Sequence, residues 1–290
     1  MQWDKAKNFM LIFFGLVNIL LAALIYYETT DHTLTREREA AIQAVFTQTN
    51  ISMQYPIPRQ FAPMRALRVA NYDYDKDRLL YIFFPPHAKI EYVLDSHRNE
   101  FTWENLRLVI STATGYIAFD SGQSSTGTPD KNAAIALTQK FIQEHYPDFR
   151  LDIQSTRVVR QGLRIFYRQE HQGNLIDINF VEFLVIGEGD DLAIAQVDIQ
   201  YNQPLGFSYM PQELVGSDEA LLTFVQHVRR HNDMPVTITH MDIAYFPPPL
   251  ESRAIYIPYA PIYLEPFYRI FIEGRDEPFR INAFTNHMMQ

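Results

Sequence analysis

The sequence contains no cysteine, no cluster of basic residues and no complete glycine motif for a dinucleotide. Without cysteine there is no disulfide framework, no thiolate nucleophile and no zinc site built on sulfur. The formal net charge of −9 repels phosphate backbones, so nucleic-acid binding is not expected. With 47% hydrophobic residues among 290, the chain has enough apolar material for one large or two smaller domains.

One long stretch without charge stands near the start of the chain, at residues 9–27. Its 19 residues would form a helix of about 28 Å, close to the thickness of the hydrocarbon core of a bilayer. A cleavable signal peptide is the alternative, but such a peptide ends in small residues, and this stretch ends in Leu24, Ile25, Tyr26 and Tyr27. The sequence therefore predicts a retained transmembrane helix over residues 9–27.

The charges on either side of this stretch predict its direction. Lys5 and Lys7 precede it, whereas Glu28 and Asp31 follow it. Because positively charged flanks stay in the cytoplasm, residues 1–8 are expected there, and everything after the helix is expected on the extracytoplasmic side.

A single amide, Asn18, lies near the middle of the apolar stretch, where a polar group is costly. Gly15, Asn18 and Ala22 share one face of a helix because they are spaced at i, i+3 and i+7. Small residues let a second helix approach, and an amide that finds a partner in lipid contributes about 1 kcal/mol. We therefore hypothesise that Gly15, Asn18 and Ala22 contact a partner helix, although an asparagine in a single span is also tolerated without any partner.

The remainder of the chain predicts an α+β fold of antiparallel sheets, each with a packed helix. The polar stretch that ends near residue 128 resembles a linker, so we expect a first domain over 28–128 and a second over 129–290. The second domain contains two similar blocks, each with a helix followed by Arg-Ile-Phe, a glycine turn and Ile-Asn.

Three helices are predicted outside the membrane, each from apolar spacing and a start signal. The first is capped by Thr35, the second begins at Thr128 or Pro129, and the third is capped at Ser217. A hairpin turn is predicted at residues 188–191. Runs of β-branched and aromatic residues predict the strands, among them residues 78–84, 89–94, 105–119, 156–162, 163–170, 175–187, 192–201, 236–246, 267–274 and 278–285.

The chain offers no motif that predicts catalysis, a cofactor or a metal. The alternating acids Asp73, Asp75 and Asp77 begin like a calcium loop but lack its glycine and its final glutamate, which favours a solvated turn. His227 and His231 are one helical turn apart, but no third ligand is evident. We expect a protein that is not an enzyme. Two carboxylates could still meet in space, so an anchored cell-wall hydrolase or a ligand-binding module is kept as the alternative.

Four stretches of the sequence resemble one known family. They are "MQWDKAKNFMLIFFGLVNILLA", "FYRQEHQGNLIDINFVEFLVIGEGDDLAIAQVDIQY", "LVGSDEALLTFV" and "LEPFYRIFIEGRDEPFRINAFT". Together they are similar to the YycI family, also called WalI, and the resemblance extends over nearly the whole chain.

The resemblance implies a single-pass membrane regulator of Gram-positive bacteria with a YycH/YycI-like extracytoplasmic fold. Its expected partners are a YycH-like protein and a WalK-like sensor histidine kinase (YycG), which it contacts largely through membrane helices. Through these contacts, the resemblance implies, the protein tunes a two-component system that governs cell-wall metabolism. Under this interpretation, Gly15, Asn18 and Ala22 form the contact with a partner helix.

Overall fold

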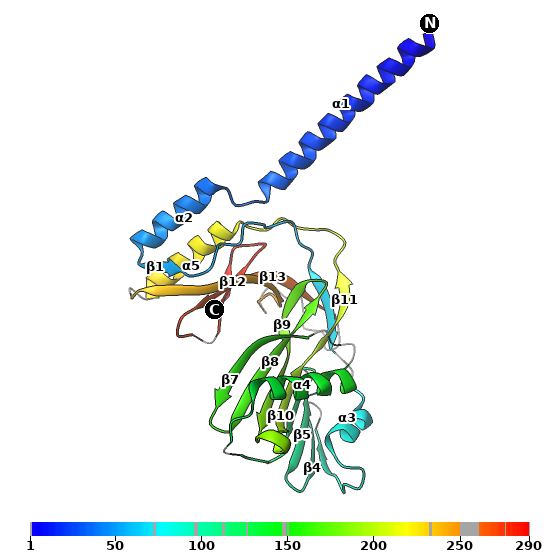
Figure 1. Cartoon of the computed structure of the whole chain (residues 1–290), viewed down its shortest axis with the longest axis vertical. Helices are drawn as coiled ribbons and strands as arrows, with labels where there is room; N and C mark the ends of the chain where they lie inside the picture. The colour runs from blue at the N-terminus through cyan, green and yellow to red at the C-terminus, as the bar shows by residue number, and fades with distance from the viewer. Residues whose placement is uncertain are drawn as a thin grey trace. The chain divides into compact units, whose positions relative to one another are not determined.

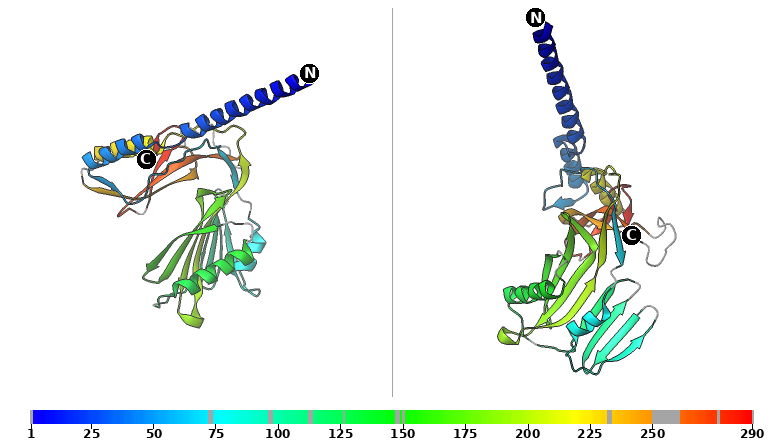
Figure 2. Two further views of the ribbon diagram at one scale, coloured as in Figure 1. Left: turned by 45° about the horizontal axis from the view of Figure 1, so that its top comes forward. Right: turned by 90° about the vertical axis from the view of Figure 1, so that its right-hand side faces the viewer.

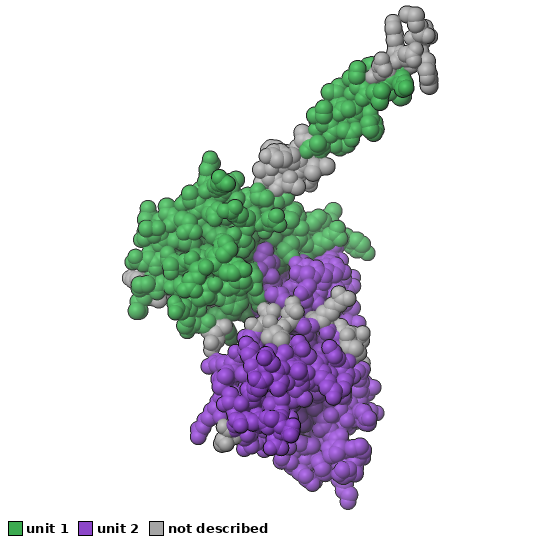
Figure 3. Space-filling model, viewed as in Figure 1, with its two compact units in different colours: residues 1–65, 209–242, 266–290 green, residues 66–208, 243–265 purple. Residues whose placement is uncertain are grey.

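The computed structural model of the chain describes residues 2–71, 74–95, 98–111, 114–125, 127–146, 149, 151–231, 234–249, 261–275 and 277–289. Within those ranges, side chains are not described at 2–6, 8, 23–31, 71, 152–154 and 231. The chain forms two compact units, coloured in Figure 3. Unit 1 consists of Met1–Arg65, Tyr209–Asp242 and Pro266–Gln290, and unit 2 consists of Ala66–Ser208 and Ile243–Glu265.

Unit 1 combines helices with a small sheet (Figure 1). Its elements are α1 (Gln2–Asp31), α2 (Arg36–Gln48), β1 (Ile51–Met53), α5 (Ser217–His231), most of β12 (Val236–Phe246) and of β13 (Ile262–Ile272), β14 (Phe279–Asn282) and β15 (Met288–Met289). The strands follow the order β1-β12-β13-β14-β15, in which β1 runs parallel to β12 and β14 runs antiparallel to both β13 and β15. Helix α2 lies beside α5, and α5 packs on β14.

Helices α2 and α5 of unit 1 form in the segments where the sequence predicts helices. The Oγ1 of Thr35 accepts a hydrogen bond from the Arg38 N–H and so caps α2, which confirms the predicted start. Helix α5 begins where the sequence predicts, but Ser217 is its first helical residue rather than the residue before it, and the Ser217 hydroxyl donates to the Pro58 oxygen. The four apolar residues that define its expected inner face are all buried, namely Leu221, Phe224, Val225 and Val228.

Unit 2 is built on an antiparallel sheet with two helices. The strands follow the order β7-β8-β9-β10-β6-β5-β4-β3, and every one of these pairs is antiparallel. The elements are β2 (Leu67–Asn71), α3 (Lys76–Phe83), β3 (Glu91–Leu94), β4 (Arg98–Trp103), β5 (Leu106–Ser111), β6 (Tyr116–Asp120), α4 (Lys131–His145), β7 (Leu151–Val159), β8 (Gly162–His171), β9 (Asn174–Ile186), η1 (Gly189–Asp191), β10 (Ala193–Gln200) and β11 (Asn202–Phe207).

The core of unit 2 lies between α3, α4 and one face of this sheet. It draws on residues far apart in the sequence, including Leu79, Leu108, Ile142, Phe183 and Val197. Figure 2 shows α4 lying across the strands. Short strands β2 and β11 pair with each other, and β2 also pairs with the first residues of β13.

One predicted strand is wrong. Residues 78–84 form most of helix α3 and its C-cap. The carboxylate of Asp75 accepts hydrogen bonds from the N–H groups of Asp77 and Arg78 and thereby caps the helix. Leu79 and Phe83, four residues apart, are both buried on the inner face. The local cap and this spacing outweigh the strand propensity of the aromatic residues.

The second predicted helix forms slightly later than expected. Helix α4 begins at Lys131, because the carboxylate of Asp130 accepts a hydrogen bond from the Ala133 N–H and acts as the cap. The predicted turn at residues 188–191 is confirmed, since η1 joins β9 to β10, which pair with each other.

The division into units differs from two consecutive domains. Residue 128, the expected boundary, lies inside unit 2, between β6 and α4. Strand β6 pairs with β10 in the register Phe119↔Val197, so segments before and after this point share one sheet. The fold is mixed α and β with a large antiparallel sheet and five α-helices in the described residues.

Helix α1 contains the long apolar stretch of the sequence and is 30 residues long. Apart from the half-buried Val17, the large apolar side chains described in it, from Phe9 to Leu21, are between 50% and 74% exposed. In the part of the chain that the structure describes, no helix is both long and apolar enough to cross a membrane. The structure thus shows a helix over residues 9–27, but it does not show that this helix spans a bilayer.

Candidate functional site

The predicted contact face on α1 is exposed in the structure. Gly15, Asn18 and Ala22 are all exposed to solvent. A Cβ atom added at Gly15 would meet no other atom within 4 Å. The three residues therefore form a narrow surface of small side chains around one amide, which we call the α1 face.

The amide of Asn18 is already bonded within its own helix. Its Nδ2 donates a hydrogen bond of 2.8 Å to the backbone oxygen of Phe14, four residues earlier. This bond lowers the cost of placing the amide among apolar groups. An asparagine side chain has two N–H donors and an acceptor oxygen, so after this bond one donor and the oxygen can serve a second helix.

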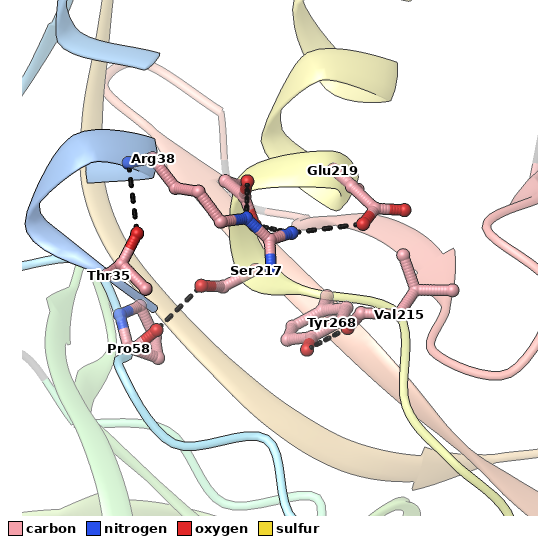
Figure 4. A network of polar contacts seen from close by, with 8 residues as sticks. Thr35, Arg38, Pro58, Val215, Ser217, Glu219 and Tyr268 are labelled. Atoms are coloured by element: carbon pink, nitrogen blue, oxygen red, sulfur yellow. Dashed lines mark hydrogen bonds and ion pairs between the residues drawn. The ribbon is translucent and has the colours of Figure 1, made fainter. Parts of the chain in front are cut away.

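A charged joint connects α2 to α5 within unit 1 (Figure 4). Arg38 Nε donates a hydrogen bond to Asp218 Oδ2, and Arg38 Nη2 donates one to Asp218 Oδ1, both at 2.7 Å. Arg38 Nη2 also lies 3.0 Å from Glu219 Oε1. The Asp218 side chain is only 11% exposed. A bidentate pair between arginine and a carboxylate is among the strongest ion pairs in proteins.

Neighbouring contacts fix the first turn of α5 in place (Figure 4). The Ser217 hydroxyl donates to the backbone oxygen of Pro58 at 2.6 Å, and the Tyr268 hydroxyl donates to that of Val215, also at 2.6 Å. Burial raises the pKa of Tyr268, so this phenol stays protonated as a donor.

The segment that follows α1 is also tied to unit 1. Thr33 forms an isolated antiparallel bridge with Gln60, and the Leu34 N–H donates to the Arg59 oxygen at 2.8 Å. Leu34 itself is buried. A continuous set of contacts therefore leads from the end of α1 through α2 to the Arg38–Asp218 joint.

The face of the unit 2 sheet opposite the core carries a row of polar side chains. Arg164 bonds to Glu182 at 3.2 Å and to Gln196 at 3.4 Å, and Gln196 in turn donates to Asp120 at 3.0 Å. One guanidinium and two carboxylates are thus linked, through the Gln196 amide, across β8, β9, β10 and β6. Such contacts are typical of cross-strand pairs on an exposed sheet face.

One tyrosine on this face has a strongly shifted pKa. Partial burial raises the pKa of Tyr116, and its 2.5 Å hydrogen bond to Asp198 raises it further. The phenol is thus held as a neutral donor, which is the opposite of what a nucleophile or general base requires.

The candidate metal ligands of the sequence lie only partly within the described residues. Asp75 serves as a helix cap, and Asp73 lies outside the described residues. The His227 ring packs edge-on against Phe279 at 6.0 Å, and the side chain of His231 is not described. Among the residues searched, those described by the structure, no group of three or more His, Asp or Glu side chains could hold a metal ion.

The Arg38–Asp218 joint escaped sequence reasoning because its partners are 180 residues apart. Each residue alone resembles an ordinary charge on a helix surface. The signal lay only in the position of Asp218, an acid in the first turn of a predicted helix that is otherwise apolar on its inner side.

No family model matches the sequence. No curated protein matches it either. Among solved structures, it is similar to the Bacillus megaterium YpeB C-terminal domain, with 10% sequence identity and a TM-score of 0.42, over 75% of this chain and 96% of that chain. At that score the likeness carries no argument about function.

Proposed function

We propose that this chain is a membrane-anchored regulatory protein, with residues 9–27 of α1 spanning the membrane. The support is the length of the uncharged stretch, about 28 Å of helix for its 19 residues, and the basic residues Lys5 and Lys7 before it. In this arrangement residues 1–8 lie in the cytoplasm, and the chain from residue 28 onward, which includes all of unit 2 and the rest of unit 1, lies on the extracytoplasmic side.

One observation carries the proposal, namely the exposure of the apolar side chains of α1. Phe9, Met10 and Phe14 are 72%, 74% and 69% exposed, and they belong to a continuous apolar surface around the helix. Exposed apolar area is costly in water. A lipid environment removes that cost, and a helix satisfies all of its own backbone hydrogen bonds there.

The partners in this proposal are a YycH-like protein and a WalK-like sensor histidine kinase. Contact is made through membrane helices, with the α1 face of Gly15, Asn18 and Ala22 turned toward a partner. The regulated process is cell-wall metabolism. The chain acts through binding and does not catalyse a reaction.

The contacts after α1 supply a route for the signal. A shift of α1 would act on Leu34 and α2, and through Arg38 on Asp218 at the start of α5. The link between α2 and α5 is stiff because the bidentate Arg38–Asp218 pair restrains the orientation of the two side chains as well as their distance.

The test replaces Asn18 with leucine and measures association with the WalK-like kinase in a bacterial membrane two-hybrid assay. Loss of the interhelical hydrogen bond costs about 1 kcal/mol, so association should fall about fivefold. Unchanged association would remove Asn18 from the mechanism.

A matched control keeps the composition and moves the amide. The double variant Leu16→Asn/Asn18→Leu places the amide on the opposite side of α1, since two residues turn a helix by about 200°. Association should stay low in this variant. Full recovery would show that any amide in the span suffices, and the α1 face would then have no role.

A further inference from the structure

Strand β3 ends the sheet of unit 2 with an apolar edge. It is the last strand in the sheet order and pairs with β4 along one side. Tyr92, Val93 and Leu94 are 66%, 69% and 57% exposed, three large apolar side chains in succession. Edge strands of monomeric proteins are normally protected by charge, proline or a covering element, and in β3 only the first residue, Glu91, is charged, while the three residues after it carry neither charge nor proline.

Backbone geometry shows which residues face away from β4. The Asp95 N–H donates to the Arg98 oxygen at 3.0 Å across the turn, so Asp95 points toward β4. Hydrogen-bonding direction alternates along an antiparallel strand. Val93 and Glu91 therefore also bond toward β4, whereas the N–H and C=O groups of Tyr92 and Leu94 point outward.

We propose that β3 pairs antiparallel with β3 of a second copy of this chain, about a two-fold axis at Tyr92. A symmetric pair places Tyr92 opposite itself as a hydrogen-bonded pair, which uses the outward groups just described. In this register Leu94 faces Ile90 of the other copy, so apolar residues meet on the face continuous with the core. A register shifted by one residue would centre on Val93, whose backbone groups are already used.

Charge complementarity selects the same register. Lys89 and Asp95 are both exposed, and they lie three residues to either side of Tyr92. Antiparallel pairing about Tyr92 therefore sets Lys89 of each copy opposite Asp95 of the other, which gives two symmetric pairs of opposite charge. An unrelated partner strand would need neither the symmetric spacing nor this charge order, and a second copy satisfies both.

Disulfide capture tests the register in the full chain, purified in detergent micelles. Because the native chain has no cysteine, Tyr92→Cys introduces one thiol per copy. Opposed residues in an antiparallel pair lie about 5.5 Å apart between Cα atoms, within disulfide range. Under mild oxidation, Tyr92→Cys should run on a non-reducing gel at twice the 33.9 kDa mass of the chain.

Leu94→Cys is the matched control on the same strand. Its two copies would be separated by four residues along the strands, on the order of 14 Å, which is too far for a disulfide. This variant should stay monomeric on the gel. Equal cross-linking of Leu94→Cys and Tyr92→Cys, or none by either, would overturn the proposal.

A charge exchange supplies an independent measurement. Lys89→Asp in the Tyr92→Cys background replaces two attractive contacts by two repulsive ones and should slow cross-linking about tenfold. Adding Asp95→Lys restores opposite charges at both positions and should restore the rate. If Lys89→Asp leaves the rate unchanged, or the double variant fails to recover it, the two-fold pairing is wrong.

Discussion

Asn179 uses both ends of its side-chain amide to hold the backbone of Asn202. Its Nδ2 donates to the Asn202 oxygen at 2.7 Å, and its Oδ1 accepts from the Asn202 N–H at 2.9 Å. The same Nδ2 also bonds to Gln169, and all three side chains are buried. The Asn179 side chain thus supplies the Asn202 N–H and C=O groups with the hydrogen-bond partners that a neighbouring strand usually provides.

Replacing Asn179 with alanine should lower the free energy of unfolding by about 2 to 3 kcal/mol. The change leaves a buried N–H, a buried C=O and the Gln169 amide without this partner, and each such loss carries a desolvation cost. Urea denaturation followed by circular dichroism measures the effect. Asn174→Ala is the control, because that half-buried amide donates to the Gln172 oxygen two residues away, and its loss should change stability by less than about 0.5 kcal/mol. Equal effects of both substitutions would contradict this account.

At the scale of elements, the same arrangement occurs twice along the chain. Helix α4 is followed by β7, β8 and β9, and α5 is followed by β12, β13 and β14. The repeated Arg-Ile-Phe lies in the second strand of each set, and Ile165 and Ile270 are both fully buried there. The repeated asparagines Asn179 and Asn282 are also both buried. The weak sequence similarity between these blocks therefore corresponds to a similar local structure.

The Arg38–Asp218 joint should contribute measurably to the packing of α2 on α5. Asp218→Ala should lower the free energy of unfolding by about 1 to 3 kcal/mol, because the carboxylate is largely buried and doubly bonded. Glu219→Ala should cost at most about 0.5 kcal/mol, since that side chain is 54% exposed. Thermal denaturation of these two variants, of Arg38→Ala and of Arg38→Ala/Asp218→Ala measures the coupling between Arg38 and Asp218. If the double variant loses the full sum of the single losses, the two groups act independently and the joint is unimportant.

At the scale of the whole molecule, the chain passes between its two units several times. Unit 1 is assembled from three separate segments and unit 2 from two. Strands β12 and β13 each begin in one unit and end in the other. Neither unit is therefore a single continuous segment of the sequence. Truncating the chain at one loop would remove strands from a sheet whose other strands remain.

A fragment of residues 129–290 should fail to fold on its own. It lacks β5 and β6, so β10 loses its partner on one side, and the buried Val197 and Ile199 come to lie at an open edge of the sheet. Expression of this fragment, followed by heteronuclear NMR, should show poorly dispersed amide signals or aggregation. The full chain without residues 1–31 serves as the control and should give dispersed signals. A cooperative thermal transition in the fragment would show that the boundary near residue 128 separates real domains.

Local signals predicted much of the secondary structure. The cap of α2 at Thr35 and the start of α5 at Ser217 are predicted correctly, because a polar start residue and apolar spacing are both encoded within a few residues. The strand predicted at residues 78–84 is wrong because their aromatic side chains favour a strand, whereas the cap at Asp75 stabilises a helix. The α1 face was predicted from spacing alone, and the structure adds the bond from Asn18 to Phe14.

Local sequence is enough to specify the apolar helix near the N-terminus, the cap of α2, the start of α5 and the mixed α and β character, since each depends on neighbours a few residues away. Which strands share a sheet, the Arg38–Asp218 joint and the exposed edge at β3 follow only from the three-dimensional fold. Those features depend on contacts between residues up to 180 positions apart, and no local pattern records which distant segments the burial of apolar surface will bring together.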